Sequence, residues 1–552
     1  MIFTIEINGQ TVTARRGETI LSILNRTGIR IPTLCHLAGF TPTGACRMCV
    51  VEVESMPGLV TACSHSAEEW MKIRTHSPRV MKARKTVVEL LLANHPDDCL
   101  YCDRSGSCEL QDLASELNVK ERHYRSRKPS IRIDRNCDSI ERDPAKCILC
   151  GRCIRVCDEI IGMSAIEIVG RGSKSLIGTS LNKGLNIQAC VKCGQCIMVC
   201  PTAALKEKSS YHTVIDALNN KDLFPVVQIS PGVQGSIAED LGIKGGRDLQ
   251  NLLGTALRKM GFRQVFDTSA SADLMILEIS QQLVQRIRDK EKMPLFTSCC
   301  PSWVKFVEEY KPELKKHMVA SKSPMQIMGT WIKDHYPQRM NIAKDKIFSV
   351  AVMPCTSKKH EAISGDEKDV HTIDAVLTTR ELIRMIRLFG IDFSNMEPEN
   401  TELGFGVRGS AGRLSGIAGG ETEAVIRTLY YRMTGQEISP VKINELRGLK
   451  NRKETRIKIG RSSFGFAAVS GLAAAQQLLE EIETGKSEYQ MVEVMACPFG
   501  CINGGGQRLG TDEKALKSRM KALYDADEEE MIKVAHRNPT LQEFIINTEE
   551  VI

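Results

Sequence analysis

The sequence predicts an α/β fold with largely parallel sheets for residues 210–552, preceded by small α+β domains. After residue 210, short apolar runs such as "LFPVVQISP", "KIFSVAVMPC" and "FGFAAVSG" alternate with helical patterns such as "TRELIRMIRLFG" and "LAAAQQLLEEIETG". Before residue 210, closely spaced cysteines are grouped in short segments, and the whole chain has 21 cysteines. A chain of 552 residues is too long for one core, so we expect divisions at 1–78, 79–125, 126–209 and 210–552.

Composition places the chain among ordinary globular proteins. Apolar residues make up 42% and charged residues 26% of the sequence. It contains no apolar run of about 18 residues, so we expect no membrane span. The first residues lack the pattern of a secretory signal, and metal-type cysteine spacings fit a reducing, cytoplasmic location.

The first cysteine group follows a pattern of strand, turn and short helix. "MIFTIEINGQTVTA" alternates apolar and polar residues, and "ETILSILNRTG" has helical spacing. Cys35, Cys46, Cys49 and Cys63 come next. This order resembles a β-grasp ferredoxin with a [2Fe–2S] cluster. The wide gap between the first two cysteines resembles the variant found in hydrogenases and in the large iron–sulfur subunit of respiratory complex I. A zinc site is the alternative.

The second group, "HPDDCLYCDRSGSC", contains His95, Cys99, Cys102 and Cys108. Three thiolates and one imidazole can hold a [4Fe–4S] cluster, and the neutral imidazole changes the charge of the cluster and therefore its potential. Zinc bound by one histidine and three cysteines is the competing interpretation.

The third group is a doubled motif, "CILCGRCIRVC" and "CVKCGQCIMVCP", typical of bacterial two-cluster ferredoxins. In that fold the fourth cysteine of each run binds the other cluster. One predicted [4Fe–4S] site is therefore Cys147, Cys150, Cys153 and Cys200. The other is Cys190, Cys193, Cys196 and Cys157.

Three further segments follow apolar strand patterns, where ligands of α/β folds gather. They are "TSCCPSW" at 297–303, "AVMPCTSKKHEA" at 351–362 and "EVMACPFGCINGGGQ" at 493–507. Together they resemble the three signatures of the [FeFe]-hydrogenases. The cluster order before them resembles the larger, clostridial-type members, so the resemblance covers essentially the whole chain.

The resemblance implies an H-cluster, a [4Fe–4S] cube linked through one cysteine to a diiron unit with CO, cyanide and a bridging dithiolate. Carried over by position, the cube ligands are Cys300, Cys355, Cys497 and Cys501, with Cys501 as the bridge. The resemblance also implies roles around the diiron unit. The Lys358 ammonium binds a cyanide, and Glu361 supports Lys358. The thioethers of Met353 and Met495 pack against the diiron unit, and Pro231 lines the same pocket.

Cys137 and Cys299 remain outside these ligand sets. Cys137, in "DRNCDSIE", matches no motif and is interpreted as a plain free thiol. By resemblance, Cys299 is the proton carrier nearest the bridging amine of the diiron unit, because a thiol can give and regain a proton near neutral pH. The alternative for Cys299 is a small buried residue beside a true ligand.

The formal charge of +7 does not indicate nucleic-acid binding. Oxidised clusters with their thiolates contribute about −10, which brings the holoprotein to about −3. The positive chain therefore balances its own cofactors.

Several positions depart from the family pattern. The family's proton route continues through two glutamates and a serine, but the matching positions here are Ile279, Gln282 and Val319. Glu278 is present and is expected to point elsewhere. Met325 replaces a frequent glutamine, "PFG" replaces the common "HGG" of the third motif, and Ser415 replaces a frequent phenylalanine. These changes resemble a divergent branch with an altered proton relay.

The resemblance predicts a ferredoxin-type hydrogenase that catalyses 2H⁺ + 2e⁻ ⇌ H₂, with ferredoxin or a similar small carrier and dedicated maturation proteins as partners. Three alternatives remain open. A hydrogen sensor with slow turnover shares the cofactor; the sequence shows neither the expected fused signalling domain nor loss of Cys299, but the altered relay keeps this alternative open. An iron–sulfur assembly protein would lack the full motif set. A subunit like that of complex I explains residues 1–209 but not the last three motifs.

Overall fold

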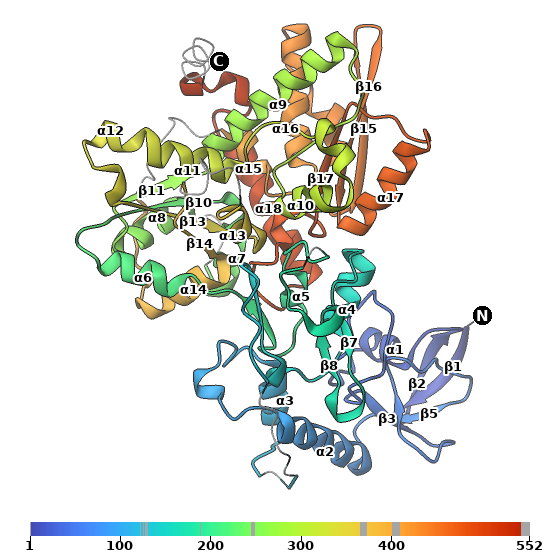
Figure 1. Ribbon diagram of the computed structural model, residues 1–552. Helices are drawn as coiled ribbons and strands as arrows, with labels where there is room; N and C mark the ends of the chain where they lie inside the picture. The colour runs from blue at the N-terminus through green and yellow to red at the C-terminus, as the bar shows by residue number, and fades with distance from the viewer. Residues whose placement is uncertain are drawn as a thin grey trace. The chain divides into compact units, whose positions relative to one another are not determined.

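The computed structural model describes residues 2–121, 123, 124, 126, 131–187, 189–243, 249–364, 372–399 and 409–541. The chain forms two compact units (Figure 1). Unit 1 comprises Met1–Glu159, Ser164–Ile187 and Val199–Lys206, and unit 2 comprises Ile160–Met163, Gln188–Met198 and Glu207–Ile552. The finer division into four domains stays a prediction. Among the described helices, none combines the length and apolar character that crossing a membrane requires.

Unit 1 opens with an antiparallel hairpin of β1 (Ile2–Ile7) and β2 (Gln10–Arg15). Asn8 and Gly9 both have positive φ, as two-residue hairpin turns require. Helix α1 (Ile20–Arg26) follows, and β3 (Val50–Val53), β4 (Val60–Thr61) and β5 (Lys72–Arg74) complete a sheet of order β2-β1-β5-β3-β4. The buried faces of β1 and α1 form one apolar core, as the two periodicities predict.

The rest of unit 1 consists of one long helix, α2 (Pro78–Asn94), and short elements between the cysteine groups. These are η1 (Cys99–Tyr101), α3 (Glu109–Glu116), β6 (Ile140–Arg142), η2 (Pro144–Lys146), α4 (Arg152–Arg155), η3 (Val156–Ile160), β7 (Glu167–Val169), η4 (Gly172–Lys174), β8 (Leu176–Gly178), η5 (Ser180–Asn182) and β9 (Leu205–Glu207). The pairs β6–β9 and β7–β8 each form a two-stranded sheet.

Unit 2 is built on two sheets. The first has the order β11 (Gln264–Asp267), β10 (Phe224–Ile229), β13 (Ile347–Met353) and β14 (Ala375–Thr378), with all neighbours parallel. The second has the order β12 (Leu295–Phe296), β17 (Met491–Met495), β16 (Ser462–Ser470) and β15 (Arg452–Ile459). The predicted α/β class with parallel sheets is confirmed, except that β15 and β16 are antiparallel. Only Gly460 and Arg461 join those two strands, which is too short for a crossover.

Helices flank both sheets of unit 2 (Figure 1). They are α5 (Gln195–Met198), α6 (Tyr211–Asn219), η6 (Pro231–Val233), α7 (Gln234–Leu241), α8 (Leu249–Met260), α9 (Ser269–Asp289), α10 (Pro301–Tyr310), η7 (Pro312–His317), α11 (Pro324–Asp334), α12 (Tyr336–Met340), η8 (Lys344–Lys346), α13 (Ser357–Glu361), α14 (Thr379–Leu388), α15 (Ser410–Leu414), α16 (Gly420–Thr434), η9 (Pro440–Leu446), α17 (Leu472–Glu483), η10 (Cys501–Asn503), α18 (Glu513–Glu529) and η11 (Ala535–Arg537).

Parallel strands of both sheets lead directly into the three cysteine motifs. β12 ends three residues before Cys299, and β13 and β17 each end two residues before Cys355 and Cys497. β10 ends immediately before Ser230. Because ligands gather beyond the carboxyl ends of parallel strands, this topology positions a binding site.

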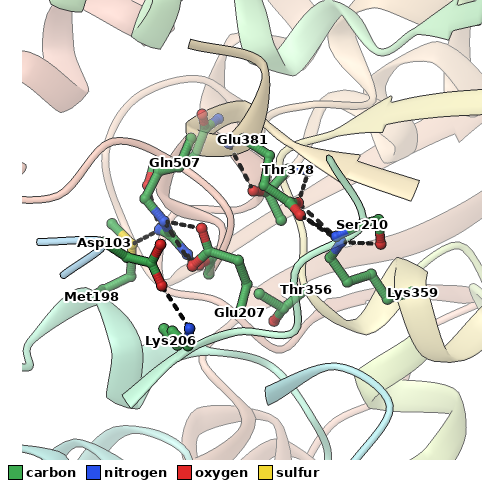
Figure 2. A network of polar contacts seen from close by, with 12 residues as sticks. Asp103, Met198, Lys206, Glu207, Ser210, Thr356, Lys359, Thr378, Glu381 and Gln507 are labelled. Carbon is green, nitrogen blue, oxygen red and sulfur yellow. Dashed lines mark hydrogen bonds and ion pairs between the residues drawn. The ribbon is translucent and has the colours of Figure 1, made fainter. Parts of the chain in front are cut away.

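A buried ionic network anchors the last motif. Arg380 of α14 is 6% exposed, pairs with the Glu207 carboxylate at 2.8 Å and donates to the Gly505 carbonyl at 2.7 Å. It also donates to the Gln507 carbonyl. Figure 2 shows Glu207 and Gln507 together with a second buried pair, Lys359 and Glu381. The glycine loop after Cys501 is therefore held by charge-assisted hydrogen bonds.

Replacing Arg380 with methionine should destabilise the protein strongly. The change leaves the Glu207 carboxylate buried without its partner, which costs about 3–5 kcal/mol. The double variant Arg380→Met/Glu207→Leu should recover much of that loss, because no charge is then stranded. Urea unfolding of the holoprotein, followed by circular dichroism, measures both. Equal destabilisation of the single and double variants would contradict the account.

The stability of unit 2 should also depend on pH through Asp273. This side chain is fully buried in α9, accepts from the Gly412 N–H at 2.7 Å, and its pKa is raised by burial to about 7. A raised pKa means that the folded state holds an extra proton, so stability falls as pH rises towards 7 and levels off above it. Asp273→Asn should flatten this slope between about pH 5.5 and 7. An unchanged slope in the variant would assign the pH dependence to other groups.

Candidate active site

One cavity in unit 2 brings the predicted cube ligands together. Its lining includes Cys300, Cys355, Cys497 and Cys501. Cys300 precedes α10, Cys355 follows β13, Cys497 follows β17, and Cys501 begins η10. Four segments separated by up to 200 residues in the sequence therefore meet at one place.

The four thiols are close enough to affect one another electrostatically. Burial raises their pKa values, and nearby cysteines raise those of Cys355, Cys497 and Cys501 further, to about 11 for Cys355. Such thiols do not ionise unaided, whereas metal coordination deprotonates them. Among the described residues, no group of three or more His, Cys, Asp or Glu side chains is arranged to hold a single metal ion. The donor set and the intervening space fit an iron–sulfur cube.

Cys299 and Cys300 pack in different environments although they are adjacent in the sequence. Cys299 packs against the apolar core that contains Ile279 and Val319, and Cys300 packs against the core that contains Trp303. Both thiols also line the cavity. The two thiols therefore reach the same space from different packing environments, as adjacent side chains that point in different directions do.

Lys358 brings a buried positive charge to the cavity. It lies in α13, is 8% exposed, and its ammonium lies 2.7 Å from the Glu361 carboxylate and 3.2 Å from the Cys299 carbonyl. Burial opposes the charge, but Glu361 and Cys299 raise the pKa of Lys358 above its usual value. The Gln326 amide in turn donates to the Glu361 backbone carbonyl at 3.0 Å. Lys358 is therefore a fixed cation that can hold a small anionic ligand.

The thioethers predicted to contact the diiron unit line the same cavity. Met353 and Met495 end their strands there, and Met325 lies beside them. Pro231 is buried at the start of η6, but the residue of this turn that lines the cavity is Ser230. Ser415 also lines it, which leaves space that a phenylalanine would fill.

The loops that carry cube ligands touch the second ferredoxin-type run within unit 2. Thr356 and Ser357 both donate to the Lys192 carbonyl at 2.9 Å. Gln195 donates to the Asn503 carbonyl at 2.8 Å. Cys193 is close enough to Cys497 to raise its pKa. A ligand of the predicted accessory cluster is thus a close neighbour of a predicted cube ligand.

At the three positions of the family's proton route, this chain has no acidic or hydroxyl side chain that could pass on a proton. Ile279 and Val319 are buried apolar side chains, and the Gln282 side chain accepts from the Ala320 N–H at 3.1 Å. Glu278 is half-buried and hydrogen-bonds the Ser321 hydroxyl.

In unit 1, the four cysteines of the first group lie close enough together to shift one another's pKa values. In the second group, His95 is buried after α2 and Cys108 precedes α3, whereas Cys99 is exposed.

The first doubled run and the last cysteine of the second share one cavity of unit 1. Cys147, Cys150, Cys153 and Cys200 all line it, as the exchange of fourth cysteines requires. Cys200 also raises the pKa values of the other three.

Family comparisons agree with this architecture. The "Iron only hydrogenase large subunit, C-terminal domain" matches residues 224–505. A "2Fe-2S iron-sulfur cluster binding domain" matches residues 2–78, the iron-sulfur binding region of "NADH-ubiquinone oxidoreductase-G" matches 84–123, and a "4Fe-4S dicluster domain" matches 146–204.

Individual relatives extend over nearly the whole chain. The NADP-reducing hydrogenase subunit HndD of Solidesulfovibrio fructosivorans and iron hydrogenase 1 of Clostridium pasteurianum are each 36% identical, over 98% of this chain and 95% of their own. A cytosolic Fe-S cluster assembly factor of Xenopus tropicalis is 31% identical over 54% of this chain and 66% of its own. The solved [FeFe]-hydrogenase HydA1 of Chlamydomonas reinhardtii, variant E141Q, has a TM-score of 0.54 and 30% identity, and covers 61% of this chain and 93% of its own. The chain therefore belongs to the iron-only, or [FeFe]-, hydrogenase family.

Proposed function

We propose that the protein is a ferredoxin-type hydrogenase that catalyses 2H⁺ + 2e⁻ ⇌ H₂. The observation that carries this proposal is the cavity in which Cys300, Cys355, Cys497 and Cys501 meet Lys358 beside a free Cys299. The four cysteine sulfurs can bind an iron–sulfur cube, and the Lys358 ammonium can bind an additional anionic ligand. When bound, the H-cluster supplies the electrons and the iron site at which hydrogen reacts.

The residues around the cofactor would bind its ligands, exclude water and carry protons. Lys358 would hold a cyanide ligand of the bound cofactor, and Glu361 positions Lys358 and maintains its charge. Met353 and Met495, which line the cavity, would pack around the diiron unit and exclude water, and Pro231 would support them from the adjacent turn. Cys299 holds and moves the proton, because its thiol is the remaining acid–base group beside the four ligands.

Electrons are proposed to pass through one [2Fe–2S] and three accessory [4Fe–4S] clusters. The contacts between the Cys193 loop and the loops of Cys355 and Cys501 support the last step of this route. Ferredoxin is the proposed carrier and the cytoplasm the proposed location, with maturation proteins that supply the diiron unit. NADP, in the name of one relative, is the competing acceptor. Reduction assays with ferredoxin and with NADP distinguish the two.

A hydrogen sensor with slow turnover is the second candidate. The observation that favours it is the loss of relay groups at Ile279 and Val319, which are both buried in an apolar core. H₂-dependent dye reduction by fully matured protein discriminates the two functions. Fast turnover supports the enzyme, and negligible turnover in protein with a loaded diiron unit supports the sensor.

Replacing Cys299 with alanine should lower H₂-dependent dye reduction by about 10²- to 10⁴-fold, the usual contribution of a positioned acid–base group. Cluster content should stay unchanged, because Cys299 is not a ligand. Cys137→Ala is the matched control, since that thiol is fully buried in unit 1 and lies outside every motif. Near-full activity of Cys299→Ala, at full cluster content, would contradict the proposed role.

A further inference from the structure

Gln507, the last residue of the segment 493–507, is a buried amide that joins three elements of unit 2. It is 0% exposed. Its side-chain nitrogen donates to the Gly232 carbonyl at 2.7 Å and to the Cys501 carbonyl at 3.0 Å. Its side-chain oxygen accepts from the Thr379 hydroxyl at 3.0 Å. One side chain therefore connects η6, η10 and α14.

Two of these elements meet at the active cavity. Cys501 lines the cavity, and so does Ser230, which lies just before η6. The two segments also touch each other, because a first side-chain carbon at Gly232 would lie 3.9 Å from the β-carbon of Cys501 and 3.4 Å from the Pro354 ring. The Gln507 amide therefore spans the contact between the η6 turn and the cysteine proposed to bridge the cube and the diiron unit.

Thr379 anchors the opposite end of the Gln507 amide. The amide nitrogen can only donate hydrogen bonds and the amide oxygen can only accept them. The Thr379 hydroxyl occupies the oxygen, so the nitrogen faces the carbonyls of Gly232 and Cys501. Thr379 is also 0% exposed, so water does not compete for these bonds.

The first turn of α14, which carries Thr379, is itself firmly held. Thr378 caps this helix in a capping box with Glu381, and the Glu381 carboxylate pairs with the buried Lys359 at 2.9 Å. Arg380 donates to the Gln507 backbone carbonyl. The start of α14 therefore holds Gln507 through both its side chain and its backbone.

We propose that Gln507 is a positioning residue that fixes Cys501 relative to the η6 turn, and that Thr379 anchors its amide on α14. The inference rests on the proposed hydrogenase function and deepens it. Cys501 is the residue proposed to join the cube to the diiron unit, so a displacement of its backbone would change the surroundings of the CO and cyanide ligands. A misplacement of about 1 Å can lower an enzymatic rate about 100-fold.

The first test compares infrared spectra of matured, full-length variants in the region where CO and cyanide absorb. Thr379→Val removes the hydroxyl but keeps the branched shape, so the amide loses its anchor and the bands should shift or split. Thr379→Ser keeps the hydroxyl and should retain the wild-type bands. Gln507→Leu removes all three hydrogen bonds and should give the larger shift. Bands at wild-type positions in both Gln507→Leu and Thr379→Val would overturn the inference.

Gln250→Leu is the matched control. Gln250 is another buried amide of unit 2, 2% exposed in α8, and is not among the residues that line the cavity. Its replacement should leave the CO and cyanide bands in place and keep H₂ turnover, whereas Gln507→Leu should lower turnover by up to about 100-fold. An equal band shift in Gln250→Leu would assign the effect to general loosening of unit 2 and refute a specific role for Gln507.

The second test needs no diiron unit, because Cys501 is also a proposed ligand of the cube. Full-length protein with iron–sulfur clusters alone is exposed to an iron chelator. Gln507→Leu and Thr379→Val should release the iron of the cube faster than the wild type, Thr379→Ser and Gln250→Leu. Release at the wild-type rate in both variants would contradict the positioning of Cys501. A matured wild type without CO and cyanide bands would refute the proposed function instead, and iron release would then decide the role of Gln507.

Discussion

Four sulfurs crowded into one buried cavity impose the constraint on which the rest of unit 2 depends. Cys300, Cys355, Cys497 and Cys501 lose solvent, and their mutual repulsion further disfavours ionisation. A cluster of metal cations can hold them together as thiolates. The two sheets satisfy this requirement by ending parallel strands at one place, and Lys358 adds a fixed cation to the cavity lining.

The loop after Cys501 also has to pass very close to the backbone of two other segments, which glycine allows because it has no side chain. A side chain at Gly504 would place its first carbon 2.2 Å from the Pro354 carbonyl oxygen, and one at Gly505 would lie 2.1 Å from that of Cys193. The loop after Cys501 therefore touches the segment of a cube ligand and the segment of a predicted accessory ligand. Arg380 fixes this loop through its carbonyls, so a buried ion pair holds the contact that we propose for electron transfer.

The sequence predicted the metal chemistry better than the proton chemistry. Cysteine ligands occur at fixed spacings next to strand ends, so motifs located the cavity and also the shared site of Cys147 and Cys200. The surroundings of Ile279 and Val319 depend on tertiary packing, which no spacing reveals. The antiparallel pairing of β15 and β16 follows from the two-residue turn of Gly460 and Arg461, which was not predicted from the sequence. Which residue of the η6 turn lines the cavity, Ser230 and not Pro231, also depends on the folded backbone.

Infrared spectroscopy of anaerobically purified, matured protein tests the central claim most directly, because CO and cyanide ligands absorb where protein does not. We expect stretching bands of both ligands in the wild type, and their loss in Cys501→Ser, which removes the proposed bridge to the diiron unit. A wild type that lacks these bands after complete maturation, or a Cys501→Ser variant that retains them unchanged, would contradict the assignment of this cavity as the site of an H-cluster.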